Sequence, residues 1–412
     1  MKKLLLLGGF PQMIDIVMTA KDMGIYTIVV DKDEHSPAKR FADRALHIST
    51  DRIDLLEKIC REEKVDGVFT GFEDFNIHIA CALANRLHLP FYATDSQIAT
   101  VTDKLRFKQA CRTYGVPTIE QYTESEALKQ AKYPYIVKPA DSYGSRGITV
   151  CRNQIELLRG IEKAKNASAT KKTIIERFID HEYGTELFYT VVNGNIHLSA
   201  TADRYTVRNG ETTVPLPVAE VFPSHHRDEM QTILDTPIRA MLKGMGIRNG
   251  LVLVQALYDG DGGYFVYEMA YRFTGEQHYR LLEKQNGVSL ARMMILLALG
   301  EDIGEYDTPL LDDTAFHKPS VNLALVLNEG KIGHIEGLQK VYQLDEVISY
   351  NLTHAEHDEI APSGDYSHML IRINMVAESY SRLCAAIKAV DDAVSVTSDA
   401  GEDMLAMHFL LN

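Results

Sequence analysis

The sequence has few cysteines, and their spacing argues against the common cysteine-based sites. Five cysteines are spread over 412 residues with no CxxC pair. Such a scatter predicts neither a disulfide framework nor a zinc site. We therefore expect a protein of a reducing compartment, with the cytoplasm as the best fit. The five positions are Cys60, Cys81, Cys111, Cys151 and Cys384.

Long apolar runs are also missing. The N-terminal stretch MKKLLLLGGF holds only four leucines before two glycines. No small-residue cleavage site follows, so we interpret this stretch as a first buried strand and not as a signal peptide. No other stretch approaches the roughly 20 apolar residues that a membrane helix requires. The sequence therefore predicts no membrane-spanning helix.

A surplus of positive charge is absent too. The chain has 43 Lys and Arg against 57 Asp and Glu, a net charge of −14, and it has no local basic patch. Such a balance repels nucleic-acid phosphates and anionic lipid. We therefore expect small molecules as partners, with no nucleic acid and no membrane.

The first hundred residues show alternating strands and helices. KLLLLGG and YTIVVDKD are apolar runs separated by a helical pattern, which is typical of parallel strands covered on both faces. The alternation predicts a Rossmann-like parallel-sheet domain over residues 1–98. Its first turn reads Gly8-Gly9-Phe10-Pro11-Gln12. Because this is not GxGxxG, a dinucleotide-dependent oxidoreductase is disfavoured.

The pattern changes near residue 99. Thr102 or Asp103 is placed to cap a helix, and several strands with one intervening helix follow. A loop is expected over residues 205–224, followed by a helix and two strands that a Gly- and Asp-rich turn joins. The last hundred residues read mostly as strands. The sequence thus predicts an α+β region followed by a β-rich region.

One constellation of possible chemistry lies at the end of a strand. Lys138 precedes a loop that contains Ser142, Gly144, Ser145 and Gly147. Glycines let backbone N–H groups approach phosphate oxygens closely, and the lysine would add a point charge. On its own, the stretch also fits an ordinary turn between two strands.

A second constellation strengthens the first. Gln255 and Glu268 lie on two strands joined by a short turn, and their spacing lets both side chains point to one side of a hairpin. Oxygen ligands of this kind bind Mg²⁺. Arg272 could neutralise charge on a transferring phosphoryl group or an acyl phosphate. Without the loop after Lys138, a surface ion pair between Glu268 and Arg272 would be the better interpretation.

Four motifs in order resemble a known family. Asp103-Lys104 with GVPT, then YIVKPADSYGSRGI, then IIERFIDHEYGTE, then GLVLVQALYDGDGGYFVYEMAYR resemble the ATP-grasp superfamily. The similarity is greatest to its carbamoyl phosphate synthetase, biotin carboxylase and amino-acid ligase branch and extends to about residue 300. It implies a pre-ATP-grasp Rossmann-like domain (1–98), an ATP-grasp domain (99–310, with a lid subdomain at about 125–190) and a β-rich C-terminal domain (311–412).

The resemblance also implies the cofactors and their ligands. The cofactors would be ATP and Mg²⁺ or Mn²⁺, with Gln255 and Glu268 as metal ligands and with Arg272 and Lys138 as catalytic residues. The segment 176–179 would pair with adenine through its backbone, and Glu182 would hold the ribose. By resemblance, the nucleotide-binding residues are Lys104, Lys138, Ser142, Gly144, Ser145, Gly147, Glu176, Arg177, Phe178, Ile179 and Glu182.

The chain departs from the family pattern at one position. Where the family has E-x-N-x-R, this chain has Glu268-Met269-Ala270-Tyr271-Arg272. The alanine side chain offers no metal ligand, so a second metal site would be weakened at Ala270 or would take a ligand atom from elsewhere.

The expected function is an ATP- and Mg²⁺-dependent ligase that forms a C–N bond between a small carboxylate, such as an amino acid, and an amine through an acyl phosphate. Two alternatives stay open: an enzyme that phosphorylates bicarbonate, and an ATP-binding regulatory protein with a degenerate site. A homodimer is compatible with the sequence, and the loop 205–224 could be a substrate lid or an interface. The residues expected to contact substrate are Arg204, Arg208, Glu276, Gln277 and His278.

Overall fold

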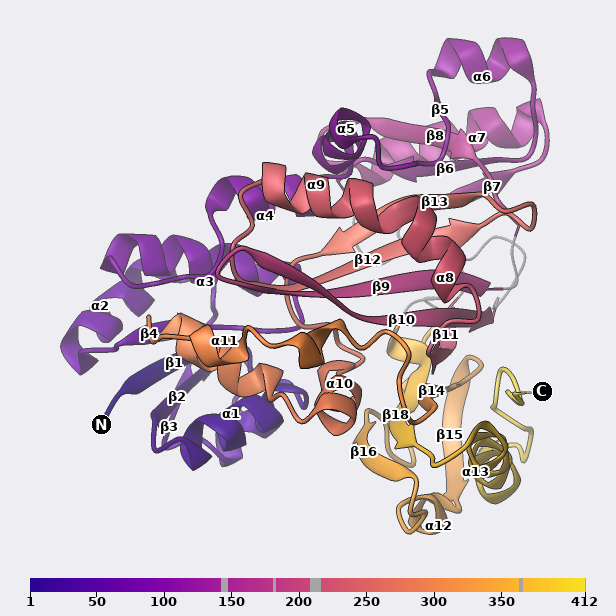
Figure 1. Ribbon diagram of the computed structural model, residues 1–412. Helices are drawn as coiled ribbons and strands as arrows, with labels where there is room; N and C mark the ends of the chain where they lie inside the picture. Colours follow the sequence, from indigo (N-terminus) through magenta and orange to yellow (C-terminus); the bar gives the residue numbers. More distant parts are fainter. Residues whose placement is uncertain (142–146, 181–182, 208–215, 363–365, 412) are drawn as a thin grey trace.

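A parallel sheet forms the N-terminal unit of the computed structural model, which describes residues 1–141, 147–180, 183–207, 216–362 and 366–411 (Figure 1). Its strand order is β3-β2-β1-β4, with every neighbouring pair parallel. The leucines of β1 have no exposed surface because helices cover both faces. The parallel sheet expected at the N-terminus is confirmed. Its elements are β1 (Lys3–Leu7), α1 (Met13–Asp22), β2 (Tyr26–Asp31), β3 (Arg44–His47), α2 (Ile53–Glu63), β4 (Gly67–Phe69) and α3 (Asp74–Leu87).

A small antiparallel sheet, here called the lid sheet, forms the top of Figure 1. Its order is β5-β8-β6-β7. Helix α7 buries Leu157, Ile161 and Ala164 against it. Gly147 has φ +78°, and a Cβ there would lie 2.6 Å from the Ala167 side chain, so this glycine lets the chain pass close to α7. The elements are β5 (Gln121–Tyr122), α6 (Glu124–Gln130), β6 (Tyr135–Pro139), β7 (Thr149–Cys151), α7 (Gln154–Ala167) and β8 (Thr173–Arg177).

A large antiparallel sheet is the centre of the described fold. Its eight strands have the order β13-β12-β9-β10-β11-β14-β18-β16. The pair β11–β14, with Ala219 opposite Leu323, carries the sheet across the boundary expected at residue 310. The strands are β9 (Tyr183–Val192), β10 (Asn195–Val207), β11 (Leu216–Phe222), β12 (Gly250–Tyr258), β13 (Tyr264–Ala270), β14 (Ser320–Val326), β16 (Val347–Leu352) and β18 (Met369–Val376).

The loop expected over residues 205–224 is wrong at both ends. Strand β10 continues to Val207, and β11 occupies Leu216–Phe222. The stretch contains three prolines, Pro215, Pro217 and Pro223, and proline is typical of loops. Pro217, however, pairs with Thr206 next to a register shift in the ladder, and irregular positions of this kind tolerate a residue without an N–H group.

The remaining helices join the units. Asp103, not Thr102, caps α5, since its Oδ1 accepts from the N–H groups of Leu105 and Arg106. Helix α11 packs so closely on β4 that a Cβ at Gly67 would lie 2.3 Å from the Ala298 carbonyl oxygen. The helices are α4 (Asp95–Thr102), α5 (Lys104–Tyr114), α8 (Arg227–Met230), a π turn (Gln231–Asp235), α9 (Thr236–Gly244), α10 (Tyr279–Asn286), α11 (Leu290–Ala298), α12 (Leu338–Val341) and α13 (Tyr380–Ala393).

A third antiparallel sheet, β17-β15-β19, lies near the C-terminus. Its strands are β15 (Gly330–Glu336), β17 (Glu359–Ile360) and β19 (Ser395–Ser398). Within the described ranges, every helix is too short or too polar to cross a membrane.

Two tyrosines tie the N-terminal unit to the large sheet. The Tyr92 hydroxyl donates to the Tyr271 carbonyl at 2.9 Å, and the Tyr271 hydroxyl lies 3.1 Å from the Tyr92 carbonyl and 2.6 Å from the Asn249 carbonyl. Burial raises the pKa of Tyr271, so its hydroxyl stays a donor. The two rings meet edge to face, with centroids 5.1 Å apart.

We predict that Tyr271→Phe lowers the free energy of unfolding by about 1–3 kcal/mol, because it removes a buried donor and leaves carbonyl oxygens without it. Urea or thermal denaturation measures the change. The control is Tyr350→Phe. Tyr350 is 48% exposed, and this substitution should change stability by less than about 0.5 kcal/mol. Equal effects of the two substitutions would contradict the prediction.

Candidate functional site

A cavity of about 690 Å³ lies between the lid sheet and the large sheet. The lid sheet contributes residues of β6, β7 and β8, and the large sheet contributes residues of β10, β12, β13 and β18. The N-terminal unit adds Gln12, Phe72 and Asp74. All three expected domains therefore line one cavity, whose size is typical of a small-molecule site.

A buried carboxylate between two lysines forms one wall. Glu176 has no exposed surface, and its Oε2 lies 2.6 Å from the Lys138 Nζ, while Oε1 contacts the Lys108 ammonium. Burial alone would raise the pKa of Glu176, but the two lysines hold it below its ordinary value. Burial lowers the pKa of Lys104, and the nearby Lys138 adds to that effect. Three lysines outnumber the two carboxylates of this wall, Glu176 and Asp141, so the wall favours an anion.

A cross-strand pair forms the opposite wall. Gln255 on β12 and Glu268 on β13 are direct partners in the ladder and both line the cavity. The Gln255 Nε2 donates to Glu186 at 2.7 Å, and its Oε1 accepts from the Tyr267 hydroxyl at 3.2 Å. One carboxylate and one amide oxygen form a donor set that suits a hard cation such as Mg²⁺.

Arg272 lies at the meeting point of two units. Its Nε donates to the Asp74 carboxylate of α3 at 2.5 Å, and its Nη1 donates to the Phe273 carbonyl at 2.9 Å. The side chain is only 16% exposed and lines the cavity. Arg272 is therefore not an exposed side chain that pairs with Glu268 at the protein surface. An acidic residue of the N-terminal unit orients this guanidinium.

The far end of the cavity is charged as well. Arg204, Glu276 and Arg372 line it, and the Arg372 Nη2 lies 3.5 Å from Glu276. Arg372 also lies 3.3 Å from Glu220 and contacts the Asn322 amide oxygen. Burial opposes ionisation of Glu276, but Arg372 and His278 lower its pKa to about 2. Glu276 is therefore a fixed negative charge at neutral pH.

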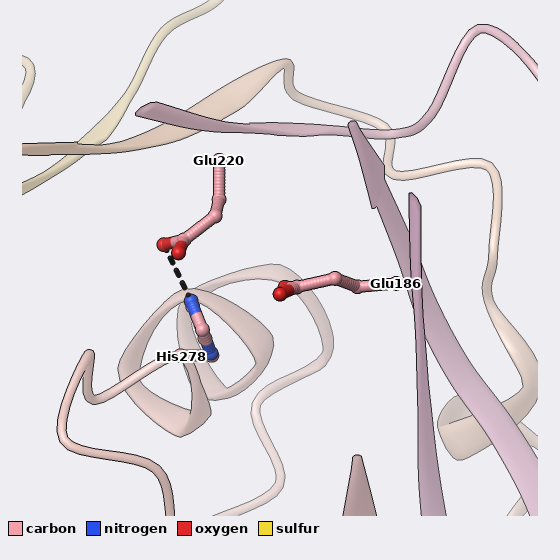
Figure 2. Close-up of side chains that lie close together, drawn as sticks. All are labelled: Glu186, Glu220 and His278. Carbon is pink, nitrogen blue, oxygen red and sulfur yellow. Dashed lines mark hydrogen bonds and ion pairs between the residues drawn. The ribbon is translucent and has the colours of Figure 1, made fainter. Parts of the chain in front are cut away.

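Beneath this end, Glu186, Glu220 and His278 come together (Figure 2). The His278 Nε2 lies 2.9 Å from Glu220, and its Nδ1 lies 2.9 Å from the Thr274 hydroxyl. Burial, reinforced by Glu220, raises the pKa of Glu186 to about 7. Burial opposes the charge on His278, yet Glu220 keeps its pKa above the ordinary value.

The structure brings most of the predicted residues to one cavity. Gln277 and His278 instead lie in the protein beneath it, and Gly147 packs against Pro139 and Ala167. Some predicted positions fall outside the described residues: Ser142, Gly144, Ser145, Glu182 and Arg208. The predicted residues that line the cavity are Lys104, Lys138, Glu176, Arg177, Phe178, Ile179, Arg204, Gln255, Glu268, Arg272 and Glu276.

Sequence reasoning missed several charged residues around the cavity. Lys108 follows Lys104 by four positions, which places both on one helix face, and this spacing could have identified it. Arg372 interrupts the apolar strand MLIRINMV, which is a comparable signal. Asp74, Glu186 and Glu220 carry no local signal, because their role depends on long-range strand pairing and on packing between units.

Comparison with known proteins gives a consistent result. Residues 103–306 match the family model described as carbamoyl-phosphate synthase L chain, ATP binding domain. The carbamoyl phosphate synthase large chain of Sulfurisphaera tokodaii is 26% identical over 329 residues, which are 74% of this chain and 30% of the relative. This chain thus spans about three tenths of the length of that relative.

Solved structures share the fold over nearly the whole chain. An L-amino acid ligase from Bacillus licheniformis has a TM-score of 0.79 at 18% identity, covering 97% of this chain and 99% of the other. The biotin carboxylase domain of the 2-oxoglutarate carboxylase from Hydrogenobacter thermophilus has a TM-score of 0.77 at 20% identity, covering 98% and 91%. The family match, the shared fold and the two charged walls of the cavity agree, and residues 103–306 are accordingly an ATP-grasp domain.

Proposed function

We propose that the protein is an ATP- and Mg²⁺-dependent ligase that joins a small carboxylate to an amine. The observation that carries the proposal is the cavity itself, which has Lys104 and Lys138 on one wall and the Gln255–Glu268 pair on the other. A triphosphate with its cation needs such facing walls, one cationic and one with oxygen ligands.

The nucleotide base would lie between the two sheets. Apolar side chains of Ile136 and Val150 face this space from the lid sheet, and those of Leu253 and Leu257 face it from β12. The segment 176–179 lines the same space. The N–H groups of Arg177 and Phe178 donate to the carbonyl oxygens of Glu120 and Pro134, so these two groups are not the ones that would pair with adenine.

The metal would be held by the Gln255 amide oxygen and the Glu268 carboxylate. Their register and their shared place in the cavity wall fit Mg²⁺ or Mn²⁺. When bound, the cation would neutralise charge on the phosphate oxygens. No protein nucleophile is required, because the chain contributes position and charge.

The proposed reaction has two steps. A substrate carboxylate oxygen bonds to the γ-phosphorus of ATP, and the bond to the β-γ bridging oxygen breaks, which gives ADP and an acyl phosphate. A neutral amine then attacks the acyl carbon, phosphate leaves and the amine loses a proton. Lys138 would hold the γ-phosphate, and Arg272, oriented by Asp74, would stabilise the acyl phosphate.

The far end of the cavity supports an amino acid as one substrate. Glu276 is ionised at neutral pH and would hold an ammonium group. Arg204 offers a guanidinium group to a carboxylate. The likeness to an L-amino acid ligase favours the same substrate class.

A second candidate is phosphorylation of bicarbonate. The similarity to carbamoyl phosphate synthase and to a biotin carboxylase domain crystallised with MgADP and bicarbonate favours it. The arginines at the far end of the cavity would also accept this small anion. A bicarbonate requirement for ADP formation separates it from the ligase.

A third candidate, an ATP-binding regulatory protein, is favoured by Ala270. This residue lines the cavity two positions after Glu268, and its side chain supplies no oxygen. Tight ATP binding without turnover on any substrate would favour this candidate over both enzymes.

The direct test of the proposal is ADP and phosphate release from Mg-ATP with pools of amino acids and small carboxylates, each with and without bicarbonate. We expect at least one amino-acid pool to raise turnover without bicarbonate, since the far end of the cavity carries charges of both signs. Turnover that depends on bicarbonate alone, or no turnover with ATP bound, would overturn the ligase proposal.

We predict that Lys138→Ala weakens ATP binding by about ten-fold or more, because a charge-assisted contact to a phosphate is lost. Calorimetry measures the affinity, and thermal melting checks the fold, since Glu176 loses one of its two lysines. The matched control is Lys132→Ala, an exposed lysine outside the cavity lining. An unchanged affinity in Lys138→Ala would show that the phosphates lie elsewhere.

We further predict that Ala270→Asn lowers the Mg²⁺ concentration needed for half-maximal ADP formation by about three- to ten-fold, because it adds an oxygen ligand beside Glu268. Mg²⁺ titration at saturating ATP provides the measurement. An unchanged or higher Mg²⁺ requirement would mean that no metal approaches position 270.

A further inference from the structure

The buried cluster of Figure 2 is the first candidate for a site beyond the nucleotide cavity. Glu186, Glu220 and His278 offer ligand atoms within 4.8 Å of one another. Arg204 lies 3.6 Å from Glu186, however, and Arg372 lies 3.3 Å from Glu220. Two guanidinium groups thus balance the two carboxylates already, and we assign no metal to this cluster.

Glu186 has a second contact that points to a role in the cavity. In the sheet, Gln255 is the direct partner of Glu186 on one side and of Glu268 on the other. The three side chains therefore form a row across β9, β12 and β13. Glu186 is 1% exposed, and its Oε1 accepts from the Gln255 Nε2 at 2.7 Å.

This contact decides which way the Gln255 amide points. The oxygen and nitrogen of an amide differ little in shape, so its orientation follows from its partners. Oε1 of Glu186 lies 3.6 Å from the Arg204 guanidinium, a donor. Oε1 therefore acts as an acceptor even when Oε2 carries a proton, and it takes the NH₂ group. The Gln255 Oε1 then faces the other way, where the Tyr267 hydroxyl also donates to it.

We propose that Glu186 is a positioning residue for the metal, because it holds the Gln255 amide with its oxygen presented to the cavity. The inference rests on the proposed function, in which Gln255 is a ligand of Mg²⁺. Hard cations bind amide oxygen and not amide nitrogen, so an amide turned by 180° would offer hydrogen-bond donors where the metal must bind.

The competing acceptor is Glu268. Direct cross-strand partners have Cβ atoms about 4.5–5.5 Å apart, so the Gln255 NH₂ group could reach Glu268 if Glu186 did not hold it. That contact would occupy both expected metal ligands at once. The buried carboxylate of Glu186 prevents it by offering an acceptor on the side away from the cavity.

The test compares Glu186→Gln with Glu186→Leu. In Glu186→Gln the new amide keeps an oxygen for Gln255 and directs its own NH₂ toward Glu220, whereas leucine has a similar volume and no acceptor. The readout is Mn²⁺ affinity of the protein–ADP complex by electron paramagnetic resonance. We expect the affinity to fall by about ten-fold or more in Glu186→Leu and to stay within about three-fold of the parent protein in Glu186→Gln.

Glu220→Leu is the matched control. Glu220 is also 1% exposed and belongs to the same cluster, but its contacts are with His278 and Arg372 and not with Gln255. It should lower stability as Glu186→Leu does and leave Mn²⁺ affinity within about three-fold. Metal-free ADP affinity should be unchanged in all three variants.

Normal Mn²⁺ affinity in Glu186→Leu, or an equal loss in Glu186→Gln, would overturn the positioning role. Failure of the parent protein to bind Mn²⁺ with ADP would instead overturn the proposed function. If Glu186→Leu does not fold, a crystal structure of the parent protein with Mg²⁺ and ADP tests the positioning role instead. The inference requires a metal bond of about 2.1 Å from the Gln255 atom that faces away from Glu186, and a metal without that bond contradicts it.

Discussion

The pairing register of the strands in the large sheet decides which polar side chains face the cavity. Glu268, Gln255 and Glu186 are successive partners across three strands. Farther along the sheet, Arg204, Glu220, Asn322 and Asn374 are successive partners across β10, β11, β14 and β18. Two pairs of neighbours bond directly: Gln255 with Glu186 at 2.7 Å, and Asn322 with Asn374 at 2.9 Å. A slip by one residue would turn every one of these side chains to the other face.

These polar rows also explain why the sheet tolerates so much buried charge. A carboxylate or guanidinium without a partner inside a sheet would cost several kcal/mol. Here nearby side chains supply the partners. Gln255 bonds Glu186 from the next strand, while His278 and Arg372 contact Glu220 from outside its own strand pairs. The backbone ladder thus creates the arrangement that makes ionised groups tolerable beside the cavity.

Local patterns allowed much of this arrangement to be predicted. The apolar run of β1 indicated a parallel sheet, and the spacing of Gln255 and Glu268 across a short turn indicated that they point together, because both signals lie within a few residues. The strand β11 was missed since Pro217 reads as a loop residue until its irregular pairing with Thr206 is known. Glu186 and Asp74 were missed for a different reason, because their partners are 69 and 198 residues away in sequence.

The contact between Asp74 and Arg272 has a consequence for how the chain can change over evolutionary time. It makes the N-terminal unit part of the cavity wall, even though that unit has its own parallel sheet and its own core. Exchange of this unit by recombination would separate a guanidinium from the acid that orients it. Such an exchange would be tolerated only where the incoming unit carries an acid at the start of its third helix. The N-terminal unit and the segment that carries Arg272 are therefore expected to be inherited together.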